Sequence, residues 1–213
     1  HHAQSGQANG FCIYNDVAIT AKYLVERYNQ RVMIIDTDAH HGDGTQWSFY
    51  TDNQIMTYSI HETGKFLFPG SGHYTERGED LGYGYTVNVP LEPYTEDDSY
   101  LDVFKETVEP VIAAFKPDII LSVHGVDIHY RDPLTHISCT LSTLYTIPYI
   151  IQDLAARYCH HKVIMFGGGG YNIWRVVPRA WSHVFLSLIG EPIQQGYLPL
   201  SWINKWKLNS PVQ

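Results

Sequence analysis

The segment 36–44, DTDAHHGDG, follows an apolar run and carries three aspartates and two histidines. Asp36, Asp38 and His40 are spaced by two, so their side chains point the same way where an extended strand ends. Carboxylate oxygens and imidazole nitrogens suit a divalent ion such as Zn²⁺, and three protein ligands leave positions open for water and substrate. We predict that Asp38 and His40 supply two ligands, and that Asp127, at the end of a neighbouring predicted strand, supplies the third.

A hydrolytic metal site also needs a general base and a group that polarises the attacked carbonyl. The adjacent imidazoles of His1 and His2 offer the base, and the carboxylates of Asp36 and Asp43 are their natural partners. Tyr171 follows four glycines, which allow a close backbone approach, so its phenol is suited to face a developing oxyanion. Each feature alone has an ordinary explanation as a turn residue, a packing side chain or a tag remnant. Their coincidence after several strands favours a site.

These residues need elements that bring distant segments together, and the chain alternates predicted strands with predicted helices. Short apolar runs predict strands at 31–36, 53–60, 85–91, 118–123 and 162–166. Amphipathic patterns predict helices at 17–30, 95–115 and 143–159, the second with Thr95 as its N-cap. The alternation indicates one α/β domain over residues 1–213, with a parallel sheet flanked by helices. In such a sheet the loops that follow the strands converge on one edge, where ligands bind.

Composition limits the possible partners and the compartment. The chain has 22 acids and 14 bases, a net charge of −8, which argues against a basic nucleic-acid surface. No window of about 18 apolar residues predicts a membrane span, and no signal peptide is visible. Cys12, Cys139 and Cys159 show no C-x-x-C spacing, so a disulfide framework is not indicated and a reducing cytoplasm fits best.

Two other motifs are weaker candidates. GGGGYN at 167–172 follows a strand, but Asn172 replaces the third glycine of a dinucleotide fingerprint. The segment YCHHK, 158–162, precedes a predicted strand and so lies at the opposite edge of the sheet, where a helix C-terminal turn explains it better than a metal. His129 remains open between a supporting role at the site and an ordinary loop position.

Five segments together resemble the zinc-dependent histone deacetylase family: HHAQSGQANGFCIYNDVAI, DTDAHHGDGTQ, FLFPGSG, VDIHYRDPL and GGGGYN. Within that family, GGGGYNIWRVVPRAW resembles the bacterial acetoin-utilisation deacetylases. The resemblance spans nearly the whole chain. It implies an arginase/deacetylase-like fold, zinc held by Asp38, His40 and Asp127, and hydrolysis of acetyl-lysine in proteins to lysine and acetate. Fe²⁺ can replace zinc at such a site, and an acetate-activating enzyme is a plausible protein substrate.

The resemblance also assigns catalytic roles. His2, paired with Asp43, corresponds to the base, and His1, paired with Asp36, assists it. Tyr171 corresponds to the phenol that polarises the acetyl carbonyl.

Further residues correspond to the substrate passage and to bound K⁺ or Na⁺. Phe11 and Phe68 match the aromatic walls of a tunnel for the lysine methylenes, and Gly10 and Gly169 match its backbone lining. The residues implied for a first monovalent cation are Asp36, Ser59, Asp38, His40 and Ile60, and those for a second are Phe49, Asp52 and Ile55.

The chain departs from the family pattern in three ways. Leu67 stands where many relatives carry a second aromatic residue, and His124 stands where a small residue is usual. The family also has sheet strands and a substrate-contacting loop before the histidine pair, and a longer C-terminal end. We therefore expect an incomplete fragment of the full catalytic domain.

The sequence leaves three alternative functions to be compared with deacetylation. The same tunnel could serve acetylpolyamines or other small amides. An arginase-like enzyme with two manganese ions needs more carboxylates than the sequence offers, because position 42 is Gly and the later loop reads Asp127, Ile128, His129. The third alternative is an inactive module that only binds acetyl-lysine.

Overall fold

The computed structural model describes residues 1–192, 196–197 and 199–208. Its strands form one parallel sheet in the order β3-β2-β1-β4-β5. The strands are β1 (Val32–Asp36), β2 (Ile55–Glu62), β3 (Thr86–Leu91), β4 (Ile119–His124) and β5 (Val163–Gly167). Each corresponds to one of the apolar runs, with ends shifted by no more than two residues, so the predicted parallel sheet is confirmed.

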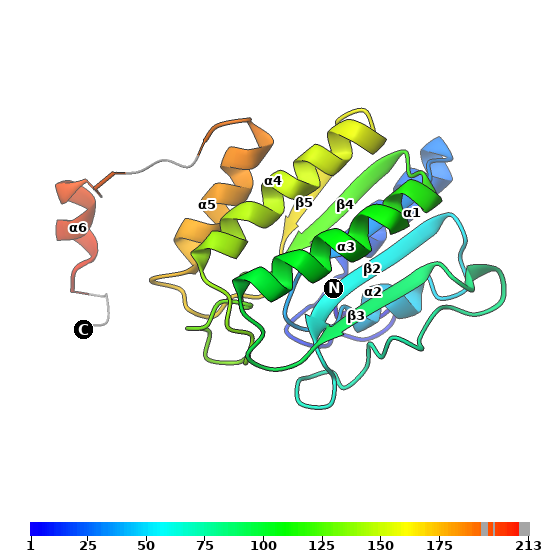
Figure 1. The fold of residues 1–213 in the computed structure, drawn as a ribbon, viewed down its shortest axis with the longest axis horizontal. Coiled ribbons are helices and arrows are strands. Elements are labelled where there is room, and N and C mark those ends of the chain that lie inside the picture. Colours follow the sequence, from blue (N-terminus) through cyan, green and yellow to red (C-terminus); the bar gives the residue numbers. More distant parts are fainter. Residues whose placement is uncertain (193–195, 198, 209–213) are drawn as a thin grey trace.

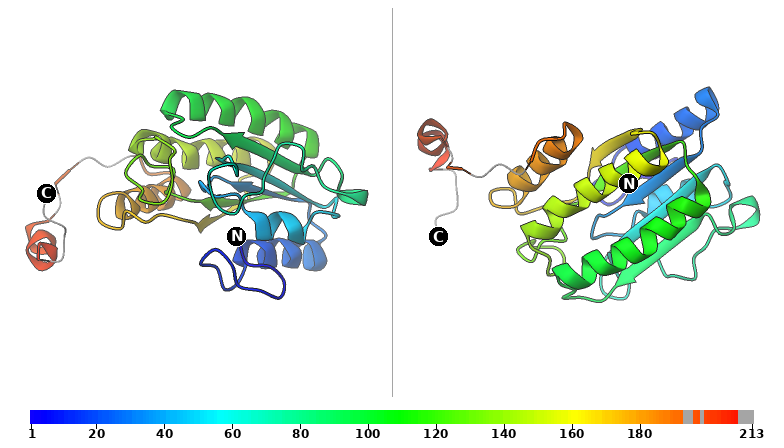
Figure 2. Two further views of the ribbon diagram at one scale, coloured as in Figure 1. Left: turned by 90° about the horizontal axis from the view of Figure 1, so that it is seen from below. Right: turned by 45° about the horizontal axis from the view of Figure 1, so that its top comes forward.

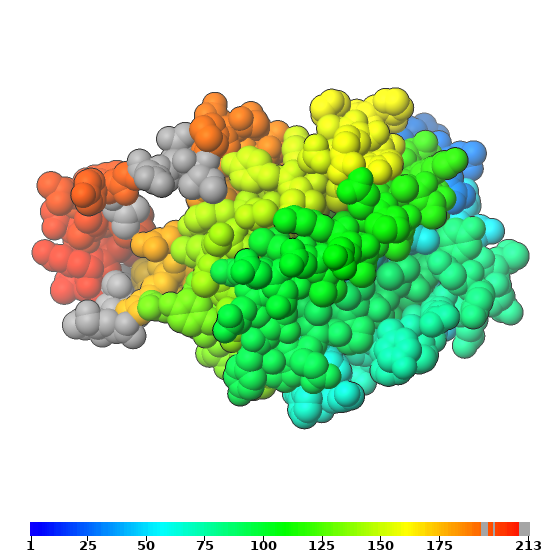
Figure 3. Space-filling model, viewed as in Figure 1, coloured from blue at the N-terminus to red at the C-terminus, as the bar shows by residue number. Residues whose placement is uncertain are grey.

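Helices cover both faces of this sheet. The helices are α1 (Asp16–Tyr28), α2 (Asp43–Ser48), α3 (Asp97–Phe115), α4 (Leu141–Tyr158), α5 (Val177–Leu188) and α6 (Leu200–Trp206), with a short 3₁₀ turn η1 at Asp80–Gly82. Figures 1 and 2 show α3 and α4 on one face, and α1 and α2 on the other. In the space-filling view of Figure 3, α3 and α4 form a continuous layer. The predicted fold class, a parallel sheet flanked by helices, is therefore confirmed.

Local capping sets the helix ends and corrects two predictions. The helix predicted to reach residue 30 ends at Tyr28, because Asn29 adopts a left-handed conformation with φ of 52° and closes the last turn. Thr95 is not the N-cap of α3: Glu96 occupies that position, and the Thr95 hydroxyl donates to the Glu92 carbonyl instead. The helix α4 begins two residues before its predicted start at residue 143, since the Thr140 side chain caps it by accepting the amide of Ser142.

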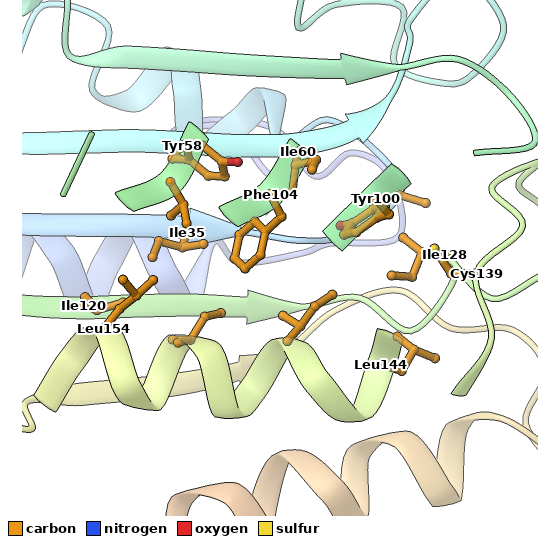
Figure 4. Close-up of a cluster of buried hydrophobic side chains, with 14 of the residues drawn as sticks. Ile35, Tyr58, Ile60, Tyr100, Phe104, Ile120, Ile128, Cys139, Leu144 and Leu154 are labelled. Atoms are coloured by element: carbon orange, nitrogen blue, oxygen red, sulfur yellow. The ribbon is translucent and has the colours of Figure 1, made fainter. Parts of the chain in front are cut away.

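The main apolar core lies between the sheet and the helices α3 and α4. Ile35, Tyr58 and Ile120 from three strands pack with Phe104 of α3, and all four side chains are fully buried. Figure 4 shows the Phe104 ring among the strand residues. A second core on the opposite face joins α1 to the strands through residues such as Val17. Burial on both faces explains why the central strands read as continuous apolar runs.

Truncation of Phe104 should destabilise the protein severely. We expect Phe104→Ala to lower the free energy of unfolding by about 3–5 kcal/mol, because the ring is fully buried and its removal leaves a cavity. Urea denaturation measures this value. Phe66→Ala is the matched control, since Phe66 is 62% exposed and its loss should change stability little. Equal effects of the two variants would contradict the assignment of the core.

At the β5 edge the sheet is less completely buried than at its centre. β5 is an edge strand whose residues are only partly buried, and α5 packs beside α4. The helix α6 has no buried residue and lies away from the sheet in Figures 1 and 2. Among the described helices, none combines the length and the apolar character that crossing a bilayer requires.

The strand order explains where a ligand can bind. From β1 the chain moves outward to β2 and β3, and then returns to place β4 on the other side of β1. This reversal between β1 and β4 is a topological switch point, where the loops leave their carboxyl ends in opposite directions and open a crevice. Asp38 and His40 follow β1, and Asp127 follows β4.

Candidate active site

The chain leaving β1 is folded by its own carboxylates. Asp36 Oδ1 accepts the amide of Asp38 at 3.0 Å, and Asp38 Oδ1 accepts the amide of His40 at 2.9 Å. These short-range bonds turn the backbone so that alternate side chains converge. Asp127 Oδ1 accepts the Ala39 amide at 3.0 Å, which joins the loop after β4 to the loop after β1.

Asp38, His40 and Asp127 form a compact buried cluster. Their potential ligand atoms lie within 4.8 Å of one another, and no other such group occurs in the part of the chain that the structure describes. His40 Nδ1 lies 2.9 Å from Asp127 Oδ2 and 3.1 Å from Asp38 Oδ1. The structure therefore brings together the three residues predicted to hold a metal.

Electrostatics shows that this cluster favours a cation at its centre. Burial and the charge of Asp38 raise the pKa of Asp127, because two carboxylates are held close together away from water. Burial opposes the charging of His40, but the two carboxylates outweigh it and raise its pKa to about 10. A site that holds positive charge this strongly, with oxygen and imidazole donors, fits a divalent metal ion.

Two glycines allow the strand exits to approach the cluster closely. A Cβ atom at Gly125 would lie 2.5 Å from Asp38 Oδ2, and one at Gly169 would lie 2.1 Å from Asp127 Oδ2. The Gly169 amide also donates to Asp38 Oδ2. Gly169 therefore lies directly against the predicted ligands, and its substrate-binding role stays a prediction.

Two histidine–carboxylate pairs lie beside the cluster. His1 Nδ1 is 2.6 Å from Asp36 Oδ2, and His2 Nδ1 is 2.7 Å from Asp43 Oδ1. The two imidazole rings are 4.0 Å apart. Burial alone would lower the pKa of His1, but Asp36 and Asp38 raise it to about 10. The predicted pairings are thus present in the structure.

A cavity of about 710 Å³ opens onto this cluster. It is lined by His2, Ala8, Asn9, Gly10, Phe11, Cys12, Ile13, His40, Leu67, Phe68, Leu134 and Tyr171. The list includes the predicted base, one predicted metal ligand, the predicted phenol and both predicted aromatic walls. A Cβ atom at Gly10 would collide with the His2 ring at 2.3 Å, so this position requires glycine. Most of the wall is apolar, as expected for a passage that holds an alkyl chain.

Tyr171 is half-buried at the base of the cavity, and its ring contacts both sides of the site. Its ring centroid lies 6.4 Å from that of His40 and 6.0 Å from that of Phe11, both in edge-to-face geometry. Burial and the charges of Asp127 and Asp38 raise the pKa of the Tyr171 phenol above its ordinary value. The hydroxyl is therefore protonated at neutral pH and can donate a hydrogen bond.

Besides Ala8, Asn9 and Ile13 of the cavity lining, three residues of the site were not identified from the sequence. Cys12 and Leu134 line the cavity, and the Asp132 carboxylate accepts the amide of Tyr171 at 2.9 Å. Cys12 and Leu134 lie within the sequence motifs that contain the predicted site residues, so these motifs could have identified them. Asp132 also lies within a motif segment, but its role could not be read from the sequence, because its partner is a backbone amide 39 residues away.

The predicted monovalent-cation residues lie close behind the metal cluster. Asp36 and Ser59 are paired neighbours on β1 and β2, and Ser59 Oγ is 2.8 Å from His61 Nδ1. Ile60 is fully buried beside them. Of the second predicted set, Phe49 and Asp52 lie in the short connection between α2 and β2, where the amide of Asp52 donates to the carbonyl of Phe49, and Ile55 is the first residue of β2.

The remaining histidines lie outside the metal cluster. His41 binds Ser71 and Gln46, and His129 Nδ1 accepts the amide of Arg131, so His129 stabilises its own loop. The 158–162 segment follows α4 and precedes β5, at the opposite edge of the sheet, as predicted.

His124 at the end of β4 is fully enclosed, with Nε2 at 3.0 Å from Ser122 Oγ. Burial lowers its pKa to about 4. The unfolded chain, with an ordinary histidine pKa near 6.5, then binds more protons than the folded protein between these values. The contribution of His124 to stability is therefore complete above about pH 6.5 and is lost as the pH falls toward 4.

We expect the parent protein to lose about 3 kcal/mol more stability than His124→Gln over this pH interval. Urea denaturation at several pH values measures the difference. His160→Gln is the control, because it makes the same replacement at an exposed position. Parallel curves for the parent and His124→Gln would show that His124 is not held neutral by burial.

The fold and the site define a parallel α/β protein with a buried carboxylate–imidazole cluster at its switch point that could hold a metal ion. A model of the histone deacetylase domain matches residues 1–188. The chain belongs to the histone deacetylase family.

Named relatives and solved structures agree with this assignment. The acetoin utilization protein AcuC of Staphylococcus aureus strain MRSA252 is 79% identical over 97% of this chain and 53% of the relative. AcuC of Bacillus subtilis strain 168 is 50% identical over 100% and 54%. A histone deacetylase homologue complexed with SAHA superposes with a TM-score of 0.84 at 31% identity, covering 91% of this chain and 51% of that one. The HDA15 HD domain gives 0.81 at 32% identity, covering 90% and 55%. The chain spans about half the length of the curated relatives it matches.

Proposed function

We propose that the protein is a zinc-dependent deacetylase that hydrolyses the acetyl amide of acetyl-lysine in proteins. One observation carries the proposal: His2, His40 and Tyr171 line the same cavity, so a base, a metal ligand and a proton donor face one reaction volume. The two carboxylates and one imidazole of the cluster suit zinc, and Fe²⁺ is the alternative ion for this donor set.

A divalent ion bound by the cluster would supply a Lewis acid and lower the pKa of water. Asp43 holds His2 through Nδ1, which leaves Nε2 free to accept a proton from the attacking water. Tyr171 donates its hydroxyl proton in a hydrogen bond to the acetyl oxygen as negative charge develops there. His2 then returns its proton to the lysine amine as the amide bond breaks. His1, whose Nδ1 lies 2.6 Å from Asp36, places its Nε2 3.8 Å from Asp38 Oδ1 and assists from beside the cluster.

The cavity wall supports a long alkyl side chain as the substrate group. Phe11 and Phe68 present exposed aromatic surface at the mouth of the cavity, and Leu67 and Leu134 add apolar area. Such walls bind methylenes by burying them from water and leave the amide to the polar end. Leu67 in place of an aromatic residue keeps this wall apolar.

Further features of the proposal concern the surroundings of the reaction. Asp36, Ser59 and Ile60 would bind K⁺ or Na⁺ with backbone oxygens of the loop after β1. The name of the relatives, acetoin utilization protein AcuC, supports a link to acetoin utilisation, and we propose an acetate-activating enzyme as the substrate protein. The free thiols of Cys12, Cys139 and Cys159 suit the cytoplasm.

The test is acetate release from an acetyl-lysine peptide and from an acetylated polyamine, using the full-length protein with zinc and potassium. We expect turnover of the peptide that disappears on chelation and returns with zinc. Turnover of the polyamine alone would replace the proposed substrate class with small amides. Restoration by manganese at two ions per chain would favour the arginase-like alternative, and peptide binding without turnover would indicate a reader.

A further inference from the structure

The segment that carries Tyr171 has little side-chain packing of its own. Four glycines precede the tyrosine, and Gly170 has φ of 156°. Hydrogen bonds to the loop after β4 hold the segment instead. The Val126 amide donates to the Gly169 carbonyl at 2.7 Å, and the Asn172 side chain donates to the Arg131 carbonyl at 3.0 Å. The position of Tyr171 therefore depends on that neighbouring loop.

Asp132 provides the bond made by Tyr171 itself. Its Oδ2 accepts the Tyr171 amide at 2.9 Å, and its Oδ1 accepts the Leu134 amide at 3.0 Å. Its own amide donates to the His129 carbonyl at 2.8 Å. The carboxylate is thus fixed by its own loop at one oxygen and holds the tyrosine segment with the other.

Burial of the Asp132 carboxylate away from water lowers the stability of the folded protein. Asp132 is only 8% exposed, and within the described residues no lysine or arginine forms an ion pair with it. An unpaired carboxylate in such a place destabilises a protein unless its hydrogen bonds compensate. Only a carboxylate offers an acceptor to both amides at once, since an asparagine would turn an NH₂ group toward one of them.

We propose that Asp132 is a positioning residue that sets the place of the Tyr171 hydroxyl relative to the metal cluster. The inference rests on the proposed deacetylase function, and it concerns the loop geometry that the function would use. Asp132 lies on the same loop as the ligand Asp127, five residues further along, so one loop fixes both a metal ligand and the proton donor. A donor displaced by about 1 Å loses much of its effect on the developing oxyanion.

The first experiment measures kcat and KM for acetyl-lysine peptide in the zinc-loaded full-length protein. We expect Asp132→Ala to lower kcat by about 10²-fold with little change in KM. The kcat of Asp132→Asn should lie between that of Asp132→Ala and that of the parent. In a Tyr171→Phe background, the same substitutions should lower kcat no further, because they act through the missing hydroxyl. An equal loss of kcat in both backgrounds would overturn the proposal.

Asp97→Asn is the matched control. Asp97 also joins two segments through a carboxylate, since it accepts the amide and hydroxyl of Thr140 and the hydroxyl of Thr143, but it lies at the start of α3 outside the cavity lining. We expect this variant to lose stability and to keep the kcat of the parent. If Asp97→Asn lost as much kcat as Asp132→Ala, the loss in Asp132→Ala would be explained by general destabilisation, and the positioning role would be wrong.

A second experiment does not depend on activity. Hydrogen exchange of a peptide that covers residues 169–173 reports on the Tyr171 amide, which should exchange slowly in the parent and at least about 10-fold faster in Asp132→Ala, but not in Asp97→Asn. Unchanged exchange would overturn the proposal. If the parent released no acetate from any acetylated amide, the proposed function would fail while the exchange result still decided whether Asp132 holds Tyr171.

Discussion

Replacement of Tyr171 by phenylalanine should lower kcat for acetyl-lysine hydrolysis by about 10²–10³-fold with KM nearly unchanged. The substitution removes one hydroxyl and keeps the ring that contacts His40 and Phe11. Because burial and nearby carboxylates raise the pKa of the phenol, the parent hydroxyl stays protonated and available as a donor. Steady-state acetate release measures the effect, and thermal denaturation should show an unchanged fold.

Tyr130→Phe is the matched control for this prediction. Tyr130 is 52% exposed and its hydroxyl accepts a bond from Arg131 outside the cavity lining. We expect this variant to keep the parent kcat. If Tyr171→Phe also kept it, the hydroxyl would have no part in the chemistry, and polarisation of the carbonyl would rest on other groups.

Substitution of Asp127 by asparagine should abolish both metal binding and turnover. Asp127 is fully buried, and its Oδ2 lies 2.9 Å from His40 Nδ1 at the centre of the cluster. The amide keeps the size of the side chain but removes the charge, so we expect zinc affinity to fall by more than the roughly 10–100-fold typical of changes in supporting residues. Zinc content after dialysis and acetate release measure the two effects.

Thermal stability gives an independent reading of the same prediction. A ligand that binds only the folded state raises the melting temperature, so chelation should lower Tm in the parent and leave it unchanged in Asp127→Asn. Asp118→Asn is the control, because Asp118 lies just before β4, at the other end of that strand, and binds the Arg31 amide. Full zinc content in Asp127→Asn would remove Asp127 from the ligand set.

The sequence was informative about the sheet because burial on both faces leaves a simple signal. Four of the six residues in the run 118–123 are apolar, and the parallel arrangement follows from the alternation of such runs with helices. The ends of α1 and α3 were less predictable, since the left-handed Asn29 and the rotated Thr95 hydroxyl depend on local geometry. The helix α2 was missed because its six residues lie inside the polar motif and show no apolar period.

The residues of the candidate site likewise fall into those that the sequence predicts and those that depend on local geometry. Asp38, His40 and Asp127 could be predicted because strand exits meet at one edge, and carboxylate and imidazole side chains are suitable metal ligands. The close approach of Gly169 to Asp127 is a property of the folded backbone that the sequence does not reveal, and its substrate-binding role stays a prediction. Asp132 lies within a motif segment, but its role could not be predicted, since its contribution is a bond to a main-chain amide that leaves no trace in side-chain type.

The pairing of β1 with β4 has a consequence for how the protein folds during synthesis. β1 pairs with β2 across 23 positions, but Val32 pairs with Ile119 across 87. Local pairings form before distant ones, because closing a longer loop costs more chain entropy. The first two metal ligands therefore leave the ribosome long before the third, and the cluster is completed only when β4 arrives. Acquisition of the metal would then mark a late event in folding, after the central strands have joined.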